Sequence, residues 1–481
     1  DCYYVNKDFY NALEYYDKAI SVAAADMDYA LYQKAMVQGV LSKYGEKVKT
    51  LESLLASHSK SGYRAAATYE LANAYGTMNR PEDALKEYAR VEKDYPQSVY
   101  VKDAIMKRGL IFLQSGKSEE ARASFEKVAV EHMGTDAARE ALNALKEYYV
   151  ERGQVDAYFE WVKNKLPGTS IELTAQDSIT YEAAYLRYMK SDCSGAMKDF
   201  ENYLGRFPDG IFSVQAHFYK SECEYFIEAY DKALKGYEYV ISKPKNTYTE
   251  QSLQAAANIH MIKIEYGPAL KYWKALDQIA EMQSTKQAAM VGQLRCYASL
   301  SGHEEVLELA RRILELSKVD KALEVEIHLL WGESALGLNR SDEAMEQFEW
   351  VFKHSKGQMA ARAQYRKASI LHSRQEYKAS EEAIFTLIDE LTSYDEWVAK
   401  ALLLLAENYY QQGDLFQAKY TLKSLVEDAR VESVKKQARE RLAIIEAEEK
   451  ANQRVRERDT LEIELDRNPV PDRTQKEEDH E

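Results

Sequence analysis

The most regular feature of the chain is a pair of apolar stripes, each at helical spacing, separated by a short polar turn. In the clearest example Ala72 and Tyr75 lie on the first stripe, Ala84 and Tyr88 lie on the second, and Pro96 follows. Residues three or four positions apart share one face of an α-helix, so each stripe predicts an amphipathic helix. Small residues let two helices approach closely, and the tyrosines fill the space around the contact. The pattern predicts an antiparallel pair of helices.

The same pattern recurs along almost the whole chain. We take the small residue of each second helix as the anchor of its repeat, and it returns at intervals of 36 to 39 residues. The anchors are Ala12, Val48, Ala84, Ala121, Ala157, Ala196, Ala233, Ala269, Val306, Ala344, Ser380 and Ala418. In eight of these twelve repeats an aromatic residue follows four positions later, on the same helical face. Val48, Val306 and Ser380 are the weaker matches. Self-similarity at a fixed period predicts a solenoid in which neighbouring repeats bury one continuous core.

The positions of proline support this assignment independently. Proline is tolerated in the first turn of a helix or beyond its end, and it is costly in the interior. Two prolines fall at the start of a second helix and four fall at its end; they are Pro81 and Pro268, and Pro96, Pro167, Pro208 and Pro244. None of these prolines interrupts a predicted helix.

The order Leu71-Ala72, Tyr75, Ala84, Tyr88 and Pro96 resembles the tetratricopeptide repeat. The resemblance covers residues 1 to about 430 and implies an all-α fold, a right-handed superhelical solenoid of about twelve helix-turn-helix repeats. The turns at 95–98 (Tyr-Pro-Gln-Ser) and 207–210 (Phe-Pro-Asp-Gly) resemble those of bacterial envelope proteins of this family, of the Tol-Pal associated and outer-membrane barrel assembly types. This second resemblance implies a periplasmic protein in a cell-envelope assembly, with association to the outer membrane as one option. A cytoplasmic location stays open as the alternative.

The two ends of the chain differ from the repeats. The first repeat holds only the end of a first helix, so we expect the chain to be a fragment of a longer protein, with a solenoid over 1–430. Over 431–459 one apolar stripe runs along an otherwise charged helix, which is typical of a solubilising C-terminal cap. The proline-containing, charged segment 460–481 predicts a disordered tail.

Charge and hydrophobicity exclude two classes of partner. The chain has 481 residues and a formal net charge of −15, which repels the phosphates of nucleic acids and of anionic lipids. The longest apolar run, Ala401 to Ala406, is far shorter than the roughly 18 residues that cross a bilayer. We therefore expect partners that are proteins or peptide segments, with no nucleic acid and no direct membrane insertion. Composition does not indicate an oligomeric state.

The sequence contains no pattern of residues that indicates catalysis. His303-Glu304 begins like a zinc-protease motif, but Leu307 stands where the second histidine is needed. There is no glycine-rich phosphate loop, and the nine histidines are scattered over different repeats. We therefore predict a protein that is not an enzyme, with no cofactor and no metal. The alternative is that the chain is the helical portion of a larger enzyme or transporter assembly whose active domain lies outside it.

The four cysteines form no metal-binding motif. Cys2, Cys223 and Cys296 occupy one position of the repeat, whereas Cys193 lies in the turn of the repeat next to that of Cys223. A disulfide between Cys193 and Cys223 stays open, since its geometry is demanding.

The resemblance also indicates a binding surface, because in the tetratricopeptide family the first helix of each repeat lines a concave groove. Carried over by position, the groove residues of three consecutive repeats are aromatic: Tyr149, Tyr181, Tyr185, Tyr188, Phe218 and Tyr225. Aromatic rings offer a large, rigid contact area with a polar edge, which suits the binding of peptide segments. The alternative is that these rings stack between neighbouring first helices and serve packing.

Overall fold

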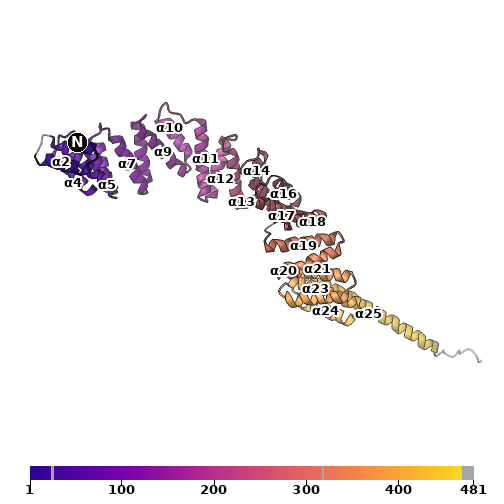
Figure 1. Cartoon of the computed structure of the whole chain (residues 1–481). Helices are drawn as coiled ribbons and strands as arrows, with labels where there is room; N and C mark the ends of the chain where they lie inside the picture. The colour runs from indigo at the N-terminus through magenta and orange to yellow at the C-terminus, as the bar shows by residue number, and fades with distance from the viewer. Residues whose placement is uncertain (23–25, 317–318, 468–481) are drawn as a thin grey trace, which may run out of the picture. The chain divides into compact units, whose positions relative to one another are not determined.

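The computed structural model describes the backbone of residues 1–22, 26–316 and 319–467, and the side chains as far as residue 454. The regular structure in these ranges consists of 25 α-helices and includes no strand, which confirms the predicted all-α class (Figure 1). The chain divides into two compact units, Asp1–Pro244 and Lys245–Glu481, which we call the N-terminal and C-terminal units.

The N-terminal unit contains fourteen of the described helices. They are α1 (Cys2–Val5), α2 (Phe9–Ser21), α3 (Met27–Val40), α4 (Tyr44–Ser57), α5 (Arg64–Thr77), α6 (Pro81–Asp94), α7 (Val101–Gln114), α8 (Ser118–Glu131), α9 (Asp136–Glu151), α10 (Val155–Lys165), α11 (Leu173–Met189), α12 (Cys193–Arg206), α13 (Ser213–Phe226) and α14 (Tyr230–Ser242).

The C-terminal unit contains the other eleven described helices. They are α15 (Thr249–Ile262), α16 (Tyr266–Ile279), α17 (Gln283–Ser299), α18 (His303–Leu314), α19 (Lys321–Gly337), α20 (Ser341–His354), α21 (Gln358–Ser373), α22 (Tyr377–Glu390), α23 (Asp395–Gln411), α24 (Leu415–Asp428) and α25 (Glu432–Arg467).

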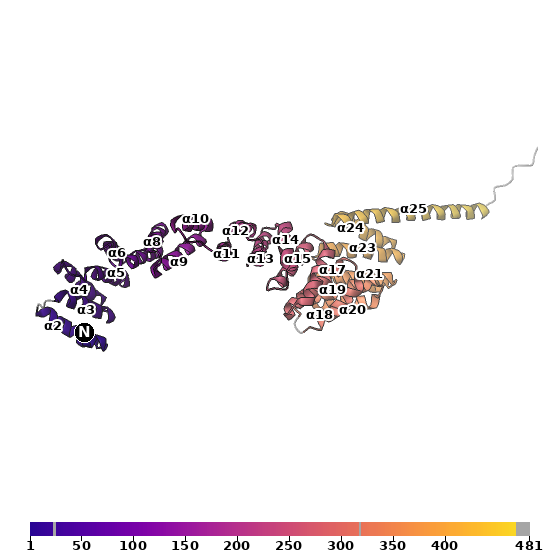
Figure 2. The ribbon, with the colours of Figure 1, turned by 90° about the horizontal axis from the view of Figure 1, so that it is seen from above.

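Within each unit the helices pack in chain order. Each odd-numbered helix up to α23 pairs with the even-numbered helix that follows it, and that helix packs on the first helix of the next repeat. The view from above shows the same succession, with α19, α21 and α23 following one another (Figure 2). Within the described ranges this gives twelve helix pairs followed by α25, as the repeat period predicts. The fold is an all-α helical repeat solenoid.

The turn within each helix pair has one conformation throughout. A residue with φ between 55° and 81° follows the first helix: Lys7, Ser42, Asn79, Gly116, Gly153, Ser191, Glu228, Ile264, Ser301, Asn339, Gln375 or Gly413. The next N–H bonds back over five residues, as from Arg80 to the carbonyl of Tyr75 at 2.9 Å. This bond and the left-handed residue are those of a Schellman cap, which stops a helix and reverses the chain. The turn therefore marks the same point in all twelve repeats.

The turns correct the predicted anchor in two repeats. In ten repeats the anchor lies five positions after the left-handed residue, and the same offset selects Lys47 instead of Val48 and Tyr158 instead of Ala157. Ala157 is exposed, whereas Tyr158 is 7% exposed. The prediction was wrong at these two positions because it looked for a small apolar residue.

A lysine fits the buried anchor position of α4 for two reasons. Gly39 on α3 leaves room for its side chain, since a Cβ there would lie 3.2 Å from Lys47 Cδ. The Lys47 ammonium donates to Glu70 Oε2 on α5 at 2.5 Å, so the charge is paired where it leaves water. The anchor of this repeat is thus charged, and it links two consecutive repeats.

Glycines on the first helix make room for the aromatic residue of the second. A Cβ at Gly109 would lie 2.5 Å from the Phe125 ring, and one at Gly332 would lie 2.7 Å from the Phe348 ring. Phe125 and Phe348 are 1% and 0% exposed. Larger residues at these glycines would displace rings that fill the core.

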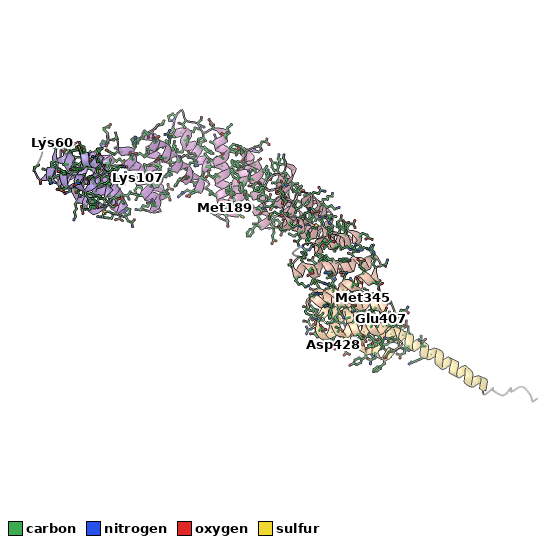
Figure 3. The ribbon with its side chains drawn as sticks, in the orientation of Figure 1. Lys60, Lys107, Met189, Met345, Glu407 and Asp428 are labelled. Carbon is green, nitrogen blue, oxygen red and sulfur yellow. The ribbon has the colours of Figure 1, made fainter. Side chains whose placement is uncertain are left out.

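The last helix closes the C-terminal unit. Val434, Ala438 and Ile445 on α25 are buried, as the predicted apolar stripe requires. Arg441 forms two hydrogen bonds to Glu407 on α23, at 2.8 and 3.0 Å (Glu407 is labelled in Figure 3). The helix continues to Arg467, beyond the end at 459 expected for the cap, since its sequence is rich in helix-forming residues up to Pro469. The part of the predicted tail from 468 to 481 lies outside the described residues.

Candidate partner-binding surface

In each unit a run of odd-numbered helices forms one layer. In the N-terminal unit α7, α9, α11 and α13 contact one another in order, and in the C-terminal unit α19, α21, α23 and α25 do the same. These are the first helices of their repeats, followed by the capping helix. We call the surface that they share the odd-helix face.

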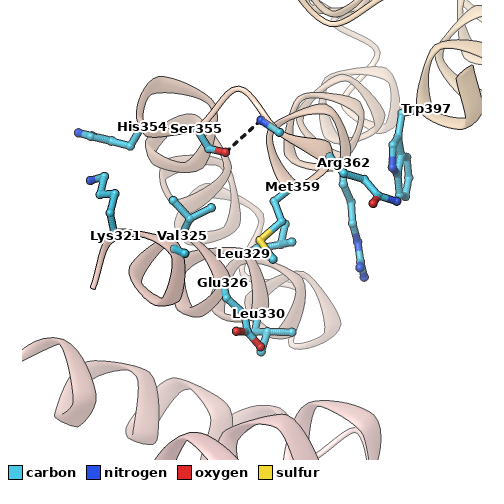
Figure 4. Close-up of a pocket in the computed structure, with 13 residues that line it drawn as sticks. Lys321, Val325, Glu326, Leu329, Leu330, His354, Ser355, Met359, Arg362 and Trp397 are labelled. Carbon is cyan, nitrogen blue, oxygen red and sulfur yellow. Dashed lines mark hydrogen bonds between the residues drawn. The ribbon is translucent and has the colours of Figure 1, made fainter. Parts of the chain in front are cut away.

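One cavity on the odd-helix face lies in the C-terminal unit, where α19, α21 and α23 meet. It has a volume of about 780 Å³. Its apolar lining comes from Val325, Leu329 and Leu330 on α19, Met359 on α21 and Trp397 on α23 (Figure 4). A concave, largely apolar site with a few polar groups at its border is the usual form of a binding pocket.

The charged groups around this cavity are already held by other side chains. Arg362 donates two hydrogen bonds to Glu333, both at 2.6 Å. Glu326 accepts two from Arg295, both at 2.7 Å. These ion pairs give the charged side chains at the border of the cavity partners on the neighbouring helices. Covering the apolar floor of the cavity would therefore contribute the largest favourable free energy, because it removes apolar surface from water.

A second cavity continues the surface along the same layer. It has a volume of about 410 Å³ and is lined by residues of α21, α23 and α25, among them Tyr365, Leu403 and Ile444. The Tyr365 ring lies 5.7 Å from the Trp397 ring, centroid to centroid. Trp397 lines the first cavity and Tyr365 the second, so the aromatic pair connects the two cavities.

Trp397 is the central side chain of this surface. The ammonium of Lys400 lies 4.4 Å from its ring centroid and the guanidinium of Arg362 lies 6.0 Å from it, so cations flank the indole. Within the described part of the chain its Nε1–H has no hydrogen-bond partner. An indole combines a large apolar surface with a donor, and tryptophan is enriched where binding energy concentrates.

The structure brings three of the predicted groove residues together in the N-terminal unit. Tyr181, Tyr185 and Tyr188 are half-buried and lie along α11. Tyr181 stacks on Phe212 at 4.4 Å, while Tyr185 and Tyr188 lie 5.0 and 4.8 Å from the ring of Tyr219 on α13. The rings therefore pack between two consecutive first helices and keep part of their surface uncovered by them.

The other three predicted groove residues pack on different partners, although the Phe218 ring also lies 5.3 Å from the ring of Tyr219. Tyr149 is 7% exposed and packs on Tyr158, and Phe218 is 5% exposed and packs on Tyr237. Tyr225 is half-buried beside the ring of Tyr230 on α14. Burial raises the pKa of Tyr149, Tyr188 and Tyr225, so these rings are neutral phenols at physiological pH.

The sequence prediction missed the cavity residues of the C-terminal unit. It looked for a concentration of aromatic residues, whereas the two cavities are lined by one tryptophan, Trp397, and one tyrosine, Tyr365, over three repeats. A signal was present, because Met359 and Trp397 both stand 21 residues before the anchors Ser380 and Ala418. Two large apolar residues at one repeat position, near the start of consecutive first helices, indicate a shared apolar surface.

The comparisons with known proteins identify the repeats. The tetratricopeptide repeat family matches residues 69–134 and 329–396, and a second description of the same repeat matches residues 400–429. The chain contains tetratricopeptide repeats, as the resemblance of its sequence implies. No curated protein matches the sequence.

Several solved structures are similar to this chain at low identity and low TM-score. Yeast Tom70 is 13% identical, with a TM-score of 0.32 over 92% of this chain and 99% of its own. A tetratricopeptide repeat protein from Parabacteroides merdae is 12% identical, with a TM-score of 0.28 over 55% and 98%. The tetratricopeptide domain of P58(IPK) is 13% identical, with a TM-score of 0.27 over 88% and 99%.

Tetratricopeptide-repeat solenoids are scaffolds for protein–protein interactions, and the repeats imply that function for this chain. Among the described residues, no helix combines the length and hydrophobicity that a bilayer crossing requires. Within the same ranges no three histidine, cysteine, aspartate or glutamate side chains are grouped so that they could hold a metal ion.

Proposed function

We propose that the chain is a non-catalytic scaffold that binds a segment of a partner protein on the odd-helix face of its C-terminal unit, beside Trp397. The observation that supports this is the pair of cavities, about 780 and 410 Å³, joined by the Trp397 and Tyr365 rings. Apolar side chains of a bound segment would fill the cavities, and the flanking ion pairs would orient its polar groups.

The form of the surface favours a segment with two large apolar side chains. Each cavity receives one of them, since each has an apolar floor of its own. Such a segment is an amphipathic helix or an extended peptide, as in other helix-lined grooves.

Selection of peptides tests this proposal without a known partner. Random peptides displayed on phage are selected on the chain, and the affinity of the enriched peptides is measured by calorimetry. Replacing Trp397 with alanine should weaken binding about tenfold or more, as for a buried aromatic anchor. Phe416→Ala is the matched control, because Phe416 is 74% exposed on α24 and lies outside both cavities. Equal affinity of the Trp397→Ala and Phe416→Ala chains would reject the site.

The aromatic residues of the N-terminal unit are a second part of the proposal. Tyr185 and Tyr225 lie on α11 and α13, which belong to the odd-helix face of that unit, and both rings are half-buried. The double substitution Tyr185→Ala with Tyr225→Ala should weaken partner capture while the helix content stays unchanged. Unchanged capture by this chain would restrict binding to the C-terminal unit.

We also propose that the scaffold acts in the periplasm of a bacterium, in an assembly of the cell envelope. The support is the resemblance of the turns at 95–98 and 207–210 to those of envelope proteins with this repeat. Fractionation of cells that make the protein tests this: recovery with the periplasmic or outer-membrane fraction is expected, and recovery with the cytoplasm would contradict it.

A further inference from the structure

Two of the four cysteines lie on neighbouring helices of consecutive repeats. Cys193 is the first residue of α12, and Cys223 lies near the end of α13. These helices pack against each other in the N-terminal unit. Cys193 is half-buried, Cys223 is 0% exposed, and both are free thiols in the structure.

The two thiols are in contact. Cys193 packs into the apolar cluster that contains Cys223, together with Tyr185, Tyr188 and Tyr219. Burial raises the pKa of the Cys223 thiol, and a hydrogen bond with the thiol of Cys193 raises it further. The pKa of the Tyr188 phenol is raised mainly by burial and then by the negative charge of Glu222, and the two thiols add to these effects. A pair of sulfurs held together by the fold meets the first requirement for a disulfide.

The other two cysteines have different surroundings. Cys2 is exposed, and Cys296 is buried with its Sγ 3.3 Å from the Sδ of Met261. Neither of them has a thiol as its observed neighbour. Cys2 and Cys296 therefore serve as internal controls for the chemistry of the pair.

We propose that Cys193 and Cys223 are a disulfide-forming site, oxidised by thiol–disulfide exchange with a small disulfide or with the disulfide of another protein. The thiolate of Cys193, which is the more accessible, attacks the external disulfide and forms a mixed disulfide, and one external thiol leaves. The thiolate of Cys223 then attacks Sγ of Cys193 and releases the second external thiol. Two protein thiols are oxidised and one external disulfide is reduced to two thiols.

The bond would restrain the part of the solenoid that carries the tyrosine cluster. It joins the second helix of one repeat to the first helix of the next and closes a loop between positions 30 apart in the sequence. A closed loop of this length removes freedom from the unfolded chain and stabilises the folded one. Tyr188 and Tyr219 belong to the same apolar cluster as the two cysteines, so the bond between α12 and α13 lies within the cluster that holds these rings.

Mass spectrometry of the whole chain tests the site. The chain is equilibrated with oxidised glutathione, and remaining thiols are blocked with N-ethylmaleimide under native and then under unfolding conditions. We expect the thiols of Cys193 and Cys223 to escape blocking, and their peptides to be joined with the loss of two hydrogens. Glutathione bound to the exposed thiol of Cys2 does not bear on the pair. The melting temperature should rise by several degrees over that of the reduced chain, as a loop-closing bond predicts.

Variants separate this site from oxidation elsewhere in the chain. Cys193→Ser and Cys223→Ala should each abolish both the joined peptides and the rise in melting temperature. A chain with Cys2→Ser and Cys296→Ala should keep both. Circular dichroism of the reduced variants checks that they fold, and Cys193→Ser, at a half-buried helix start, carries the test if Cys223→Ala does not. Glutathione retained on Cys193, blocked thiols at Cys193 and Cys223 after oxidation, or an equal rise in the Cys193→Ser chain would overturn the proposal.

Discussion

Replacing Ser380 with alanine gives its repeat the residue that eight of the twelve repeats carry at the anchor, yet we expect the change to destabilise the chain. Ser380 is 0% exposed on α22, and its hydroxyl donates to the carbonyl of Ala368 on α21 at 2.9 Å. The same oxygen accepts from Nδ2 of Asn408 on α23 at 2.8 Å. Asn408 is 0% exposed as well, and its Oδ1 bonds to His372 Nδ1 at 2.6 Å. Three consecutive helices thus share one buried polar network.

The size of the expected loss of stability depends on which polar group Ser380→Ala leaves without a hydrogen-bond partner. The Ala368 carbonyl keeps its bond within α21, so losing the serine donor costs little there. The Asn408 amide loses its acceptor inside the core, and a buried donor without a partner costs about 1–3 kcal/mol. Removing one hydroxyl leaves almost no cavity to add to this. We therefore expect Ser380→Ala to lower the local stability of α21–α23 by about 1–2 kcal/mol.

Hydrogen exchange of the backbone amides in α21, α22 and α23 measures this local stability, which suits a repeat array better than one global unfolding free energy. A double-mutant cycle supplies the control. In a chain with Asn408→Ala no side-chain amide is left without an acceptor, so adding Ser380→Ala should lower the local stability by about 0.5 kcal/mol or less. Equal costs in the two backgrounds would refute the network, and so would a gain in stability on changing Ser380 alone.

Three further predictions concern single residues. Ile264 is 70% exposed, and it is a β-branched residue in the left-handed region, at φ 61°. Ile264→Asn should therefore stabilise the C-terminal unit by about 1 kcal/mol in thermal unfolding, whereas the control Ile262→Asn, in the preceding helix, should not. Tyr203→Phe removes the hydroxyl that donates to buried Asp177 at 2.6 Å and should cost about 1–3 kcal/mol in urea unfolding, with no loss contradicting the bond. Burial lowers the pKa of His217 from 6.5 to about 4, so on acidification the unfolded chain binds a proton before the folded chain does. The free energy of unfolding is therefore highest above pH 6.5 and should fall by about 1–2 kcal/mol as the pH drops to 4, a value reduced for the partial exposure of the ring. Urea titrations over this range should show a flatter profile for His217→Asn, and an unchanged slope would contradict the assignment.

The fold could be predicted from the sequence because the pattern of buried positions recurs in twelve repeats. Ala84 with Tyr88, or Ala121 with Phe125, gives the period and the buried face directly. The prediction failed locally where another residue meets the same packing requirement. In one repeat Tyr158 occupies the anchor position in place of a small residue. In another the buried Lys47 occupies it, because Gly39 leaves room for its side chain and Glu70 pairs with its charge. Such replacements depend on residues of other helices, which a search for one residue type does not see.

The candidate site could be predicted only in part. Position in the repeat places Tyr181, Tyr185 and Tyr188 on the odd-helix face, and the structure finds them on one helix of that layer. The stacking of their rings on the next first helix depends on Phe212 and Tyr219, which lie more than 20 positions away in the sequence. A cavity is space left between the side chains of three helices, so the surface beside Trp397 appears only when their positions are known.

Photo-crosslinking from inside the larger cavity tests the proposed binding surface most directly. Benzoylphenylalanine is introduced at Met359, which lines the cavity and is 37% exposed, and separately at Phe416 on α24. We predict light-dependent crosslinks from position 359 to one apolar segment of a co-purified protein, suppressed by an excess of a selected peptide, with none from position 416. Crosslinks to that segment from position 416, or none from position 359, would contradict binding on the odd-helix face.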